Sequence, residues 1–122
     1  MDADELKQRT RAFALRIVRL VEALPHGRTA DVIGKQLLRC GASVGANYRA
    51  RCRAKSSADF IAKMGIVEEE ADESLYWMEL LIDSGLATKA TLTDLMDEGH
   101  AIVAITVAWI RTAKGRKGAH NA

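Results

Sequence analysis

The sequence predicts an all-α protein: one antiparallel, up-down-up-down four-helix bundle formed by residues 1–113. Apolar residues recur every three or four positions in four segments, which is the period of a helix with one buried face. The 122-residue chain holds a single proline, and no segment shows the apolar–polar alternation of a half-buried strand. Short connections between helices of similar length favour antiparallel neighbours, which gives this fold class.

The first helix is expected over residues 3–24. Asp2 and Glu5 have the spacing of a capping box, which satisfies free amide groups of the first turn. Pro25 disfavours helical geometry at the residue before it and so ends the helix. One face of this helix carries an apolar stripe of Leu6, Phe13, Ile17, Leu20 and Leu24.

The second helix is expected over residues 30–53, with Thr29 as its N-cap. Its interior holds Gly34, Gly41 and Gly45, and each costs about 1 kcal/mol of helix stability relative to alanine. We therefore expect another helix to pack closely against these small residues, and we take them as one sign of self-association. The apolar stripe consists of Ile33, Leu37, Cys40, Val44 and Tyr48.

The third helix is expected over residues 57–84. Ser56 and Asp59 form its predicted capping box, and Gly85 is placed to end it with a Schellman motif. The apolar seam of this helix repeats in steps of four and three, as in a heptad pattern. It consists of Phe60, Met64, Val67, Ala71, Ser74, Met78 and Leu81.

The fourth helix is expected over residues 92–113, opened by Thr91 and followed by a flexible basic tail of residues 114–122. Residues 101–110 contain Thr106 as their single polar residue, so this helix has more apolar surface than a monomeric bundle can bury. We expect the core to contain Leu95, Ile102, Ile105 and Trp109. We expect an interface with other subunits to contain Val103, Val107 and Ile110.

Charge is distributed in three blocks along the chain. Residues 1–55 carry twelve lysines and arginines against five acids, residues 56–100 carry two against eleven, and residues 101–122 carry four against none. Such blocks predict either an anionic partner for the basic segments or pairing of basic and acidic surfaces within an assembly. The candidate nucleic-acid contacts are Arg9, Arg16, Arg19, Arg49, Arg51, Arg53, Lys55, Arg111, Lys114, Arg116 and Lys117.

No catalytic residue, metal site or cofactor site is predicted. Cys40 and Cys52 lie twelve residues apart on one expected helix, about 18 Å along its axis, and cannot share a metal ion. No glutamate is followed three residues later by histidine, as di-iron bundles require. The longest apolar run is about half of a membrane span, and the acidic N-terminus lacks a hydrophobic signal core. We therefore expect a cytoplasmic protein without a membrane partner.

Ser43 and Asn47 stand one turn apart on the second helix. Asn47 adjoins the apolar stripe, and a partly buried amide must form hydrogen bonds. We expect its partners on the antiparallel third helix, where such a contact fixes the register of the two helices. The candidates are Glu70, Glu73 and Ser74. We favour this structural role over a ligand-binding one.

The second and third helices also carry a resemblance to a known family. The matching residues are the runs Ser43–Asn47, Ser57–Phe60 and Ile66–Trp77, with Leu80, Leu81 and Gly85. Through them, residues 37–86 resemble the four-helix-bundle proteins encoded in intervening sequences of 23S ribosomal RNA genes. Many members have an acid three positions after the asparagine, where this chain has Ala50.

The resemblance implies a left-handed bundle that assembles as a homopentamer, with no established enzymatic activity. The family is similar to the accessory subunits of diversity-generating retroelements, which are basic pentamers that bind a reverse transcriptase and nucleic acid. The resemblance therefore implies RNA or DNA as a partner, and a reverse transcriptase or another protein as a second one.

Two functions are compatible with these observations. The first is a non-enzymatic, oligomeric nucleic-acid-binding or adaptor protein that contacts RNA phosphates through its basic surfaces. Binding of this kind is salt-sensitive and weakly sequence-specific, because no aromatic residues stand among the arginines, and several copies increase it by avidity. The second is a protein-interaction scaffold whose basic and acidic faces pair between subunits, without a nucleic-acid role.

Overall fold

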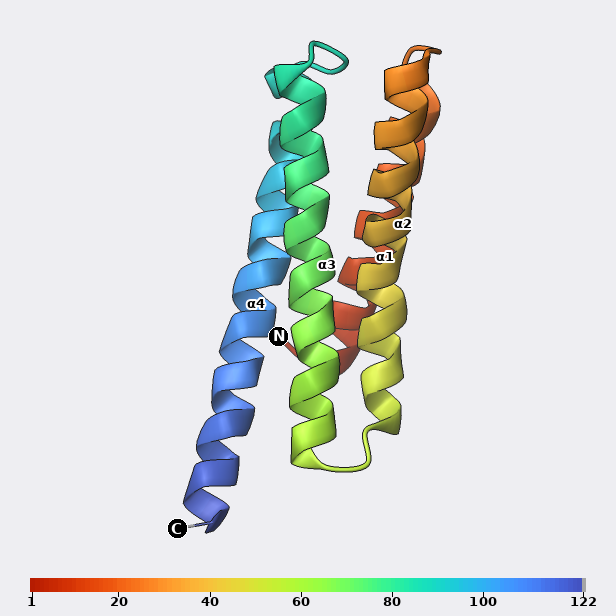
Figure 1. Cartoon of the computed structure of the whole chain (residues 1–122). Helices are drawn as coiled ribbons and strands as arrows, with labels where there is room; N and C mark the ends of the chain where they lie inside the picture. Colours follow the sequence, from red (N-terminus) through yellow and green to blue (C-terminus); the bar gives the residue numbers. More distant parts are fainter. Residues whose placement is uncertain (122) are drawn as a thin grey trace.

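The structure, a computed structural model, describes residues 1–121, apart from the side chains of Cys52 and of residues 117–121. Four helices run alternately up and down, and no strand occurs among these residues (Figure 1). The helices are α1 (Ala3–Ala23), α2 (Arg28–Ala50), α3 (Ser57–Asp83) and α4 (Lys89–Asn121), with a short 3₁₀ helix, η1 (Arg51–Arg53), after α2. The predicted all-α, four-helix fold is confirmed.

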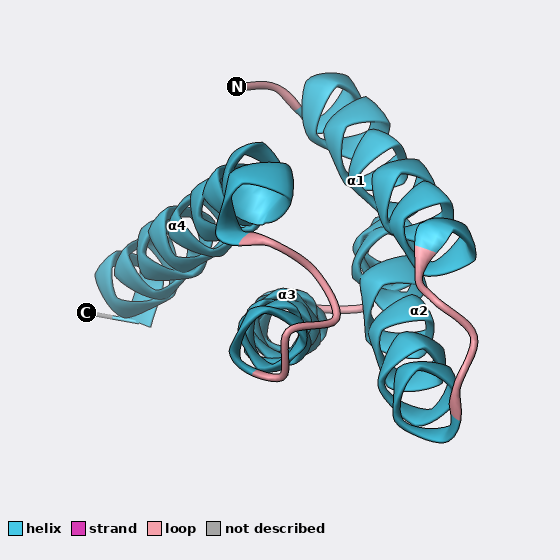
Figure 2. Ribbon diagram, turned by 90° about the horizontal axis from the view of Figure 1, so that it is seen from above, coloured by secondary structure: helices cyan, strands magenta, loops and turns pink. Residues whose placement is uncertain are grey.

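Each helix packs mainly on the next one in the chain. The pairs α1–α2, α2–α3 and α3–α4 are in contact along their length, whereas α1 and α4 meet over a short stretch. Seen along the bundle, α1 and α4 splay apart (Figure 2). The bundle therefore consists of three antiparallel pairs of consecutive helices. The contact between α1 and α4, which would close the bundle, is much smaller than these three.

The predicted caps of α1 and α3 are present. The Asp2 carboxylate accepts a hydrogen bond from the Glu5 amide at 2.8 Å, and the Ser56 hydroxyl accepts one from the Asp59 amide at 3.1 Å. At the other end of α3, Gly85 takes a left-handed φ of 78°. The Leu86 amide then donates to the Leu81 carbonyl at 3.0 Å. This is the Schellman stop that the sequence predicts.

The starts of α2 and α4 differ from the prediction. Helix α2 begins at Arg28 after Gly27, without a side-chain cap, so Thr29 already lies inside the first turn. Helix α4 begins at Lys89 because the Thr88 hydroxyl accepts a hydrogen bond from the Thr91 amide at 3.2 Å. The cap therefore stands three residues before the expected one, and Thr91 supplies the amide and not the acceptor.

The end of α4 also differs from the prediction. The helix is 33 residues long and runs to Asn121, through the segment that the sequence assigns to a separate tail. Gly115 lowers helix propensity but, unlike proline, removes no backbone hydrogen bond. The last turns consequently extend past the loop between α2 and α3 (Figure 1). Helix α2, in contrast, ends at Ala50 and gives way to η1, three residues earlier than expected.

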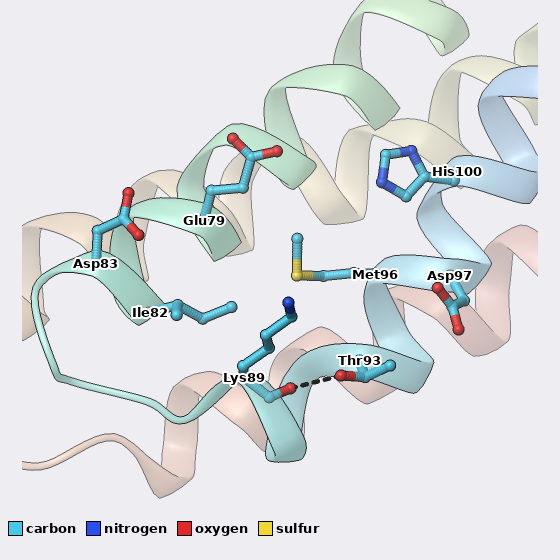
Figure 3. Close-up of a pocket in the computed structure, with 8 residues that line it drawn as sticks. All are labelled: Glu79, Ile82, Asp83, Lys89, Thr93, Met96, Asp97 and His100. Carbon is cyan, nitrogen blue, oxygen red and sulfur yellow. Dashed lines mark hydrogen bonds between the residues drawn. The ribbon is translucent and has the colours of Figure 1, made fainter.

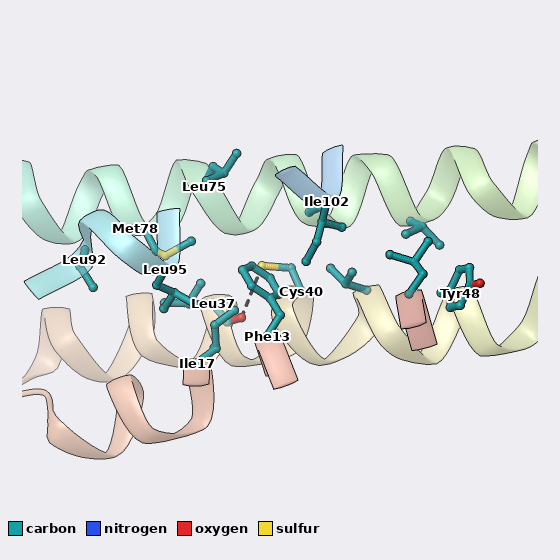
Figure 4. Close-up of a cluster of buried hydrophobic side chains, with 14 of the residues drawn as sticks. Phe13, Ile17, Leu37, Cys40, Tyr48, Leu75, Met78, Leu92, Leu95 and Ile102 are labelled. Atoms are coloured by element: carbon teal, nitrogen blue, oxygen red, sulfur yellow. Dashed lines mark hydrogen bonds between the residues drawn. The ribbon is translucent and has the colours of Figure 1, made fainter. Parts of the chain in front are cut away.

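The core confirms three of the four predicted stripes. Those on α2 and α3 are buried except for a half-buried Phe60, and the stripe on α1 is buried over its first three members (Figure 4). On α4 the buried face is rotated from the expected one. It consists of Leu92, Leu95, Gly99, Ile102, Thr106 and Ile110. The prediction that Ile110 faces another subunit is therefore wrong, and Ile105 and Trp109 are half-buried.

Thr106 is the residue that misdirected this prediction. Its hydroxyl donates within α4, with the Ile102 carbonyl at 3.0 Å and the Val103 carbonyl at 2.8 Å. Because the helix itself satisfies the hydroxyl, burial costs little. Val103 and Val107 lie beside this face and are half-buried within the chain, so the apolar surplus of α4 is smaller than the sequence suggests.

The three glycines of α2 face α1 of the same chain. A Cβ atom at Gly41 would lie 2.4 Å from the Ile17 Cδ1 atom, and one at Gly34 would lie 3.2 Å from the Val21 Cγ1 atom. The expected close approach of another helix is confirmed. The neighbour is α1, however, so these glycines are no sign of a contact between subunits.

Candidate nucleic-acid interface

The fold brings most of the predicted cations to one end of the bundle. The start of α1, the end of α2, η1 and the end of α4 lie together there (Figure 1). We call this surface the basic end and define it by the exposed side chains of Lys7, Arg11, Arg49, Arg53, Lys55, Arg111, Lys114 and Arg116. Arg16 and Arg19 are exposed on the second half of α1, away from this end. The side chain of Lys117 lies outside the described residues.

A groove between α1 and α2 lies at the basic end. Its volume is about 200 Å³, and Lys7, Arg11 and Arg49 line it. Its other lining residues are all small: Ala14, Ala42, Gly45 and Ala46. No acidic side chain lines the groove. Three cations thus surround a shallow depression that a phosphate group can approach.

Sequence reasoning selected Arg49 for this site but missed Lys7 and Arg11. A signal exists, since Lys7, Arg11 and Ala14 follow one another at helical spacing on α1. The facing small residues of α2 could not be matched to them before the pairing of the two helices was known.

Arg9 has a different role from the predicted one. Its Nε and NH2 atoms both donate to the Glu98 carboxylate, each at 2.8 Å. This bidentate ion pair joins α1 to α4, and the hydrogen bonds to Glu98 raise the pKa of Arg9. We therefore assign Arg9 to holding α1 and α4 together and not to ligand binding.

Arg51 is also engaged within the chain. Its guanidinium lies 4.6 Å from the centre of the Tyr48 ring, and its NH2 group donates to the Tyr48 hydroxyl at 2.9 Å. That hydroxyl donates in turn to the Ala3 carbonyl at 2.9 Å. The Nε atom of Arg51 is buried without a hydrogen-bond partner among the described residues. Arg51 thus anchors η1 on α2, and we assign it to this contact with Tyr48 and not to the predicted nucleic-acid contacts.

Ser43 and Asn47 bond to their own helix. The Asn47 Nδ2 group donates to the Ser43 carbonyl at 2.8 Å, and the Ser43 hydroxyl donates to the Arg39 carbonyl at 2.8 Å. Short polar side chains reach back to the preceding turn in this way. In the described part of the chain, Asn47 does not form the predicted bond to α3.

The polar connection between α2 and α3 comes from Arg39 and Cys40. The Arg39 guanidinium contacts both Glu70, at 3.5 Å, and Glu73. The Ser74 hydroxyl donates to the Glu70 carbonyl at 2.8 Å and contacts the Cys40 sulfur at 3.3 Å. The predicted residues of α3 therefore do meet α2, but through a partner that lies one turn or more before Asn47.

Cys40, Glu70 and Glu73 place a possible ligand atom each within 4.8 Å of one another. The arrangement does not favour a metal ion. The Arg39 cation already pairs with both carboxylates, and burial raises the pKa of the Cys40 thiol, whereas metal binding needs a thiolate. The cluster is a structural ion pair.

At the end opposite the basic end, one hollow is lined by more acids than cations. A hollow of about 440 Å³ between α3 and α4 has Glu79, Asp83 and Asp97 along its walls, with Lys89 and His100. Figure 3 shows these groups spread around the hollow rather than aimed at one point. Acids thus predominate among the charged residues of the hollow where α3 ends and α4 begins, whereas no acid lines the groove at the basic end.

The fold and this charge distribution define a class: a four-helix-bundle protein that presents an exposed cationic surface at one end. The chain belongs to the 23S rRNA-intervening sequence protein family, whose sequence profile matches residues 4–108. It is similar to a crystal structure of a protein of unknown function from the S23 ribosomal protein family of Bacteroides thetaiotaomicron. The two share 36% identity and a TM-score of 0.84, over 91% of this chain and 99% of the other.

Two further observations concern known proteins and membranes. No curated protein matches this sequence. In the described residues, no helix combines the length and the apolar character that crossing a membrane requires.

Proposed function

We propose that this protein is a non-enzymatic, oligomeric RNA-binding protein that holds the phosphate backbone at its basic end. The observation that carries the proposal is the groove between α1 and α2, which is lined by Lys7, Arg11 and Arg49 and by no acid. Its cations come from two helices that are held together by the glycines of α2, so the groove is a rigid feature of the fold.

The chemistry of these groups suits a phosphate backbone. Arginine guanidinium groups bind phosphate oxygens through paired hydrogen bonds, and each phosphate neutralised by a cation releases bound counterions. The small side chains at Ala42, Gly45 and Ala46 leave the groove open to a polymer chain. We expect weak sequence specificity, since contacts to phosphate carry no base information.

The proposal is tested by removing two groove cations and comparing a matched pair elsewhere. A variant with Lys7→Ala and Arg49→Ala should bind a structured RNA about tenfold more weakly at moderate salt. A control with Lys89→Ala and Arg28→Ala loses the same charges at the opposite end and should bind as the unaltered protein does. Fluorescence anisotropy measures both. Equal losses in the two variants would reject a localised site and leave only a general effect of net charge.

Self-association is the second part of the proposal, and the exposed apolar side chains support it. Apart from Met1, which precedes α1, the large apolar side chains that are exposed in the described part of the chain lie on α1, α2 and α3 and not on α4. Leu15 is 47% exposed on α1, with Val18 and Leu38 at similar exposure beside the α1–α2 groove. Ile66 and Tyr76 are 42% and 55% exposed on the outer side of α3.

These two faces have opposite charges, which favours pairing between copies. Arg19 and Lys35 are exposed near the α1–α2 apolar residues, and Glu69 and Asp72 are exposed near those of α3. Two different faces of one subunit that pair with each other form a heterologous contact, which generates a ring when the rotation between subunits closes and an open filament when it does not. This observation equally supports the scaffold function, which differs in having no RNA partner. The five-fold number, the left-handed twist and a reverse transcriptase partner stay predictions of the resemblance.

A further inference from the structure

A second hollow at the basic end contains aromatic side chains. It lies between the start of α3 and the end of α4, has a volume of about 280 Å³, and is lined by Phe60, Trp109, Thr112, Ala113 and Arg116. Phe60 and Trp109 are 49 positions apart in the sequence, so the pairing of α3 and α4 is what brings them together. We propose that this hollow takes one unstacked nucleobase of a single-stranded RNA, an inference that rests on the proposed function.

The orientation of Trp109 is fixed by residues outside the hollow. Its ring packs at a tilt against Tyr48, with 6.1 Å between the ring centres. Tyr48 is itself held by the Arg51 cation at 4.6 Å and by its hydrogen bond to Ala3. The indole is half-buried, and a half-buried aromatic ring on a rigid support provides a stacking surface that loses little entropy when a base binds.

The polar groups of the hollow complement the edge of a base. Trp109 lines the hollow, and its indole carries an N–H donor. The Thr112 hydroxyl donates to the Ala108 carbonyl at 3.0 Å and keeps its oxygen as an acceptor. The exposed Arg116 guanidinium lines the same hollow, where it can meet the phosphate that follows the bound base.

The surroundings favour a nucleic acid over an apolar ligand. No acid lines the hollow, and Lys55 is exposed just before the start of α3, near Phe60 in the sequence. A base inside the hollow therefore has the exposed Arg116 cation beside it, and Lys55 precedes the helix that supplies Phe60. Bases of a duplex are stacked and paired and cannot enter, so the site selects single-stranded RNA.

The first test compares two labelled probes: a single-stranded RNA of about 12 nucleotides, and the duplex that it forms with its complement. Phe60→Leu and Trp109→Leu remove an aromatic face and keep apolar volume. Each should weaken binding of the single strand about tenfold and leave binding of the duplex within about twofold. Val32→Ala removes an exposed apolar side chain near the start of α2, at the opposite end of the bundle, and should change neither affinity.

The second test needs no change within the hollow. The chain has two tryptophans, so Trp77→Phe leaves Trp109 as the sole emitter. The single strand should quench Trp109 emission, and the duplex should leave it unchanged. This measurement also tests the nucleobase site if the Trp109→Leu variant fails to fold.

The outcomes separate this site from the proposed function. If single strand and duplex bind equally, if Phe60→Leu changes neither affinity, or if Trp109 emission is not quenched, the nucleobase site is refuted while phosphate binding stands. If the unaltered protein binds neither RNA at low salt, the proposed function fails and the nucleobase site fails with it.

Discussion

Tyr48 of α2 contacts residues of α1, η1 and α4. Its hydroxyl donates to Ala3 at the start of α1, its ring lies under the Arg51 cation of η1, and the same ring packs against Trp109 of α4. One buried side chain therefore orders the parts of four elements that form the basic end. This explains why Arg51, despite its charge and its place in an arginine cluster, has a structural role.

A second effect at the scale of one residue is the close contact at Gly41. A Cβ atom there would lie 2.4 Å from Ile17, so Gly41→Ala should destabilise the fold by about 1–3 kcal/mol through overpacking, despite the gain in helix propensity. Gly65 of α3 has no such neighbour within 4 Å, and Gly65→Ala should stabilise by up to about 1 kcal/mol. Urea unfolding at one fixed protein concentration measures both. A stabilising Gly41→Ala would show that α1 does not pack on α2 as closely as described.

At the scale of the element, the start of α3 is held by charge as well as by its cap. The Asp59 carboxylate accepts hydrogen bonds from the Lys63 Nζ group at 2.8 Å and from the Lys55 amide at 2.9 Å. The bond from Lys63, the Lys55 amide and the positive charges lower the pKa of Asp59 below its ordinary 3.8. This end of α3 adjoins both Lys55 and Phe60, so it positions part of the candidate interface.

The lowered pKa gives a prediction with a definite sign. Asp59 binds its proton more weakly in the folded chain than in the unfolded one, so its contribution to stability is present above pH 3.8 and is lost as the pH falls through the folded pKa. Asp59→Asn should lower stability at neutral pH and have little effect near about pH 2. Denaturant unfolding across this range tests it. A difference between the two proteins that does not shrink on acidification would contradict the assignment.

The elements also show what could be predicted from sequence. The stripes of α2 and α3 and the caps at Asp2, Ser56 and Gly85 are local patterns, and they are predicted correctly. The buried face of α4 is not, because residues 101–110 are apolar nearly all round and Thr106 satisfies its own hydroxyl. Pairs such as Arg9–Glu98 join positions 89 residues apart, and no local pattern indicates them.

The candidate interface likewise has one part that local sequence predicts and one part that it does not. The charge blocks predict that the cations face an anionic partner or an acidic surface, and the antiparallel fold places most of the candidate cations at one end. The groove at Lys7 and Arg11 and the hollow at Phe60 and Trp109 each need two helices in register, which the periodicity of either helix alone does not provide.

At the scale of the whole molecule, the candidate phosphate contacts lie at the basic end while large apolar residues are exposed on the sides of the bundle. Copies that pair through their sides, with their axes parallel, present all of their basic ends on one face of the assembly. Weak contacts of single copies then add by avidity on one RNA. The two halves of the proposal, self-association and phosphate binding, are thus compatible because they use different surfaces.

The side-by-side arrangement makes a prediction about assembly. Arg19→Glu with Lys35→Glu gives both faces the same sign and should shift the protein toward a monomer in sedimentation velocity. Glu69→Lys with Asp72→Lys should do the same. A chain that carries all four changes exchanges the signs of the two faces and should associate again. If all three variants sediment like the unaltered protein, these faces do not pair.

The most direct test of the central claim is the salt dependence of RNA binding by the unaltered protein. With three groove cations in contact with phosphates, the logarithm of the affinity should fall linearly with the logarithm of the salt concentration, with a slope of about −2 or steeper. An affinity that does not change between about 50 and 200 mM salt, or no binding at the lowest salt, would contradict the account.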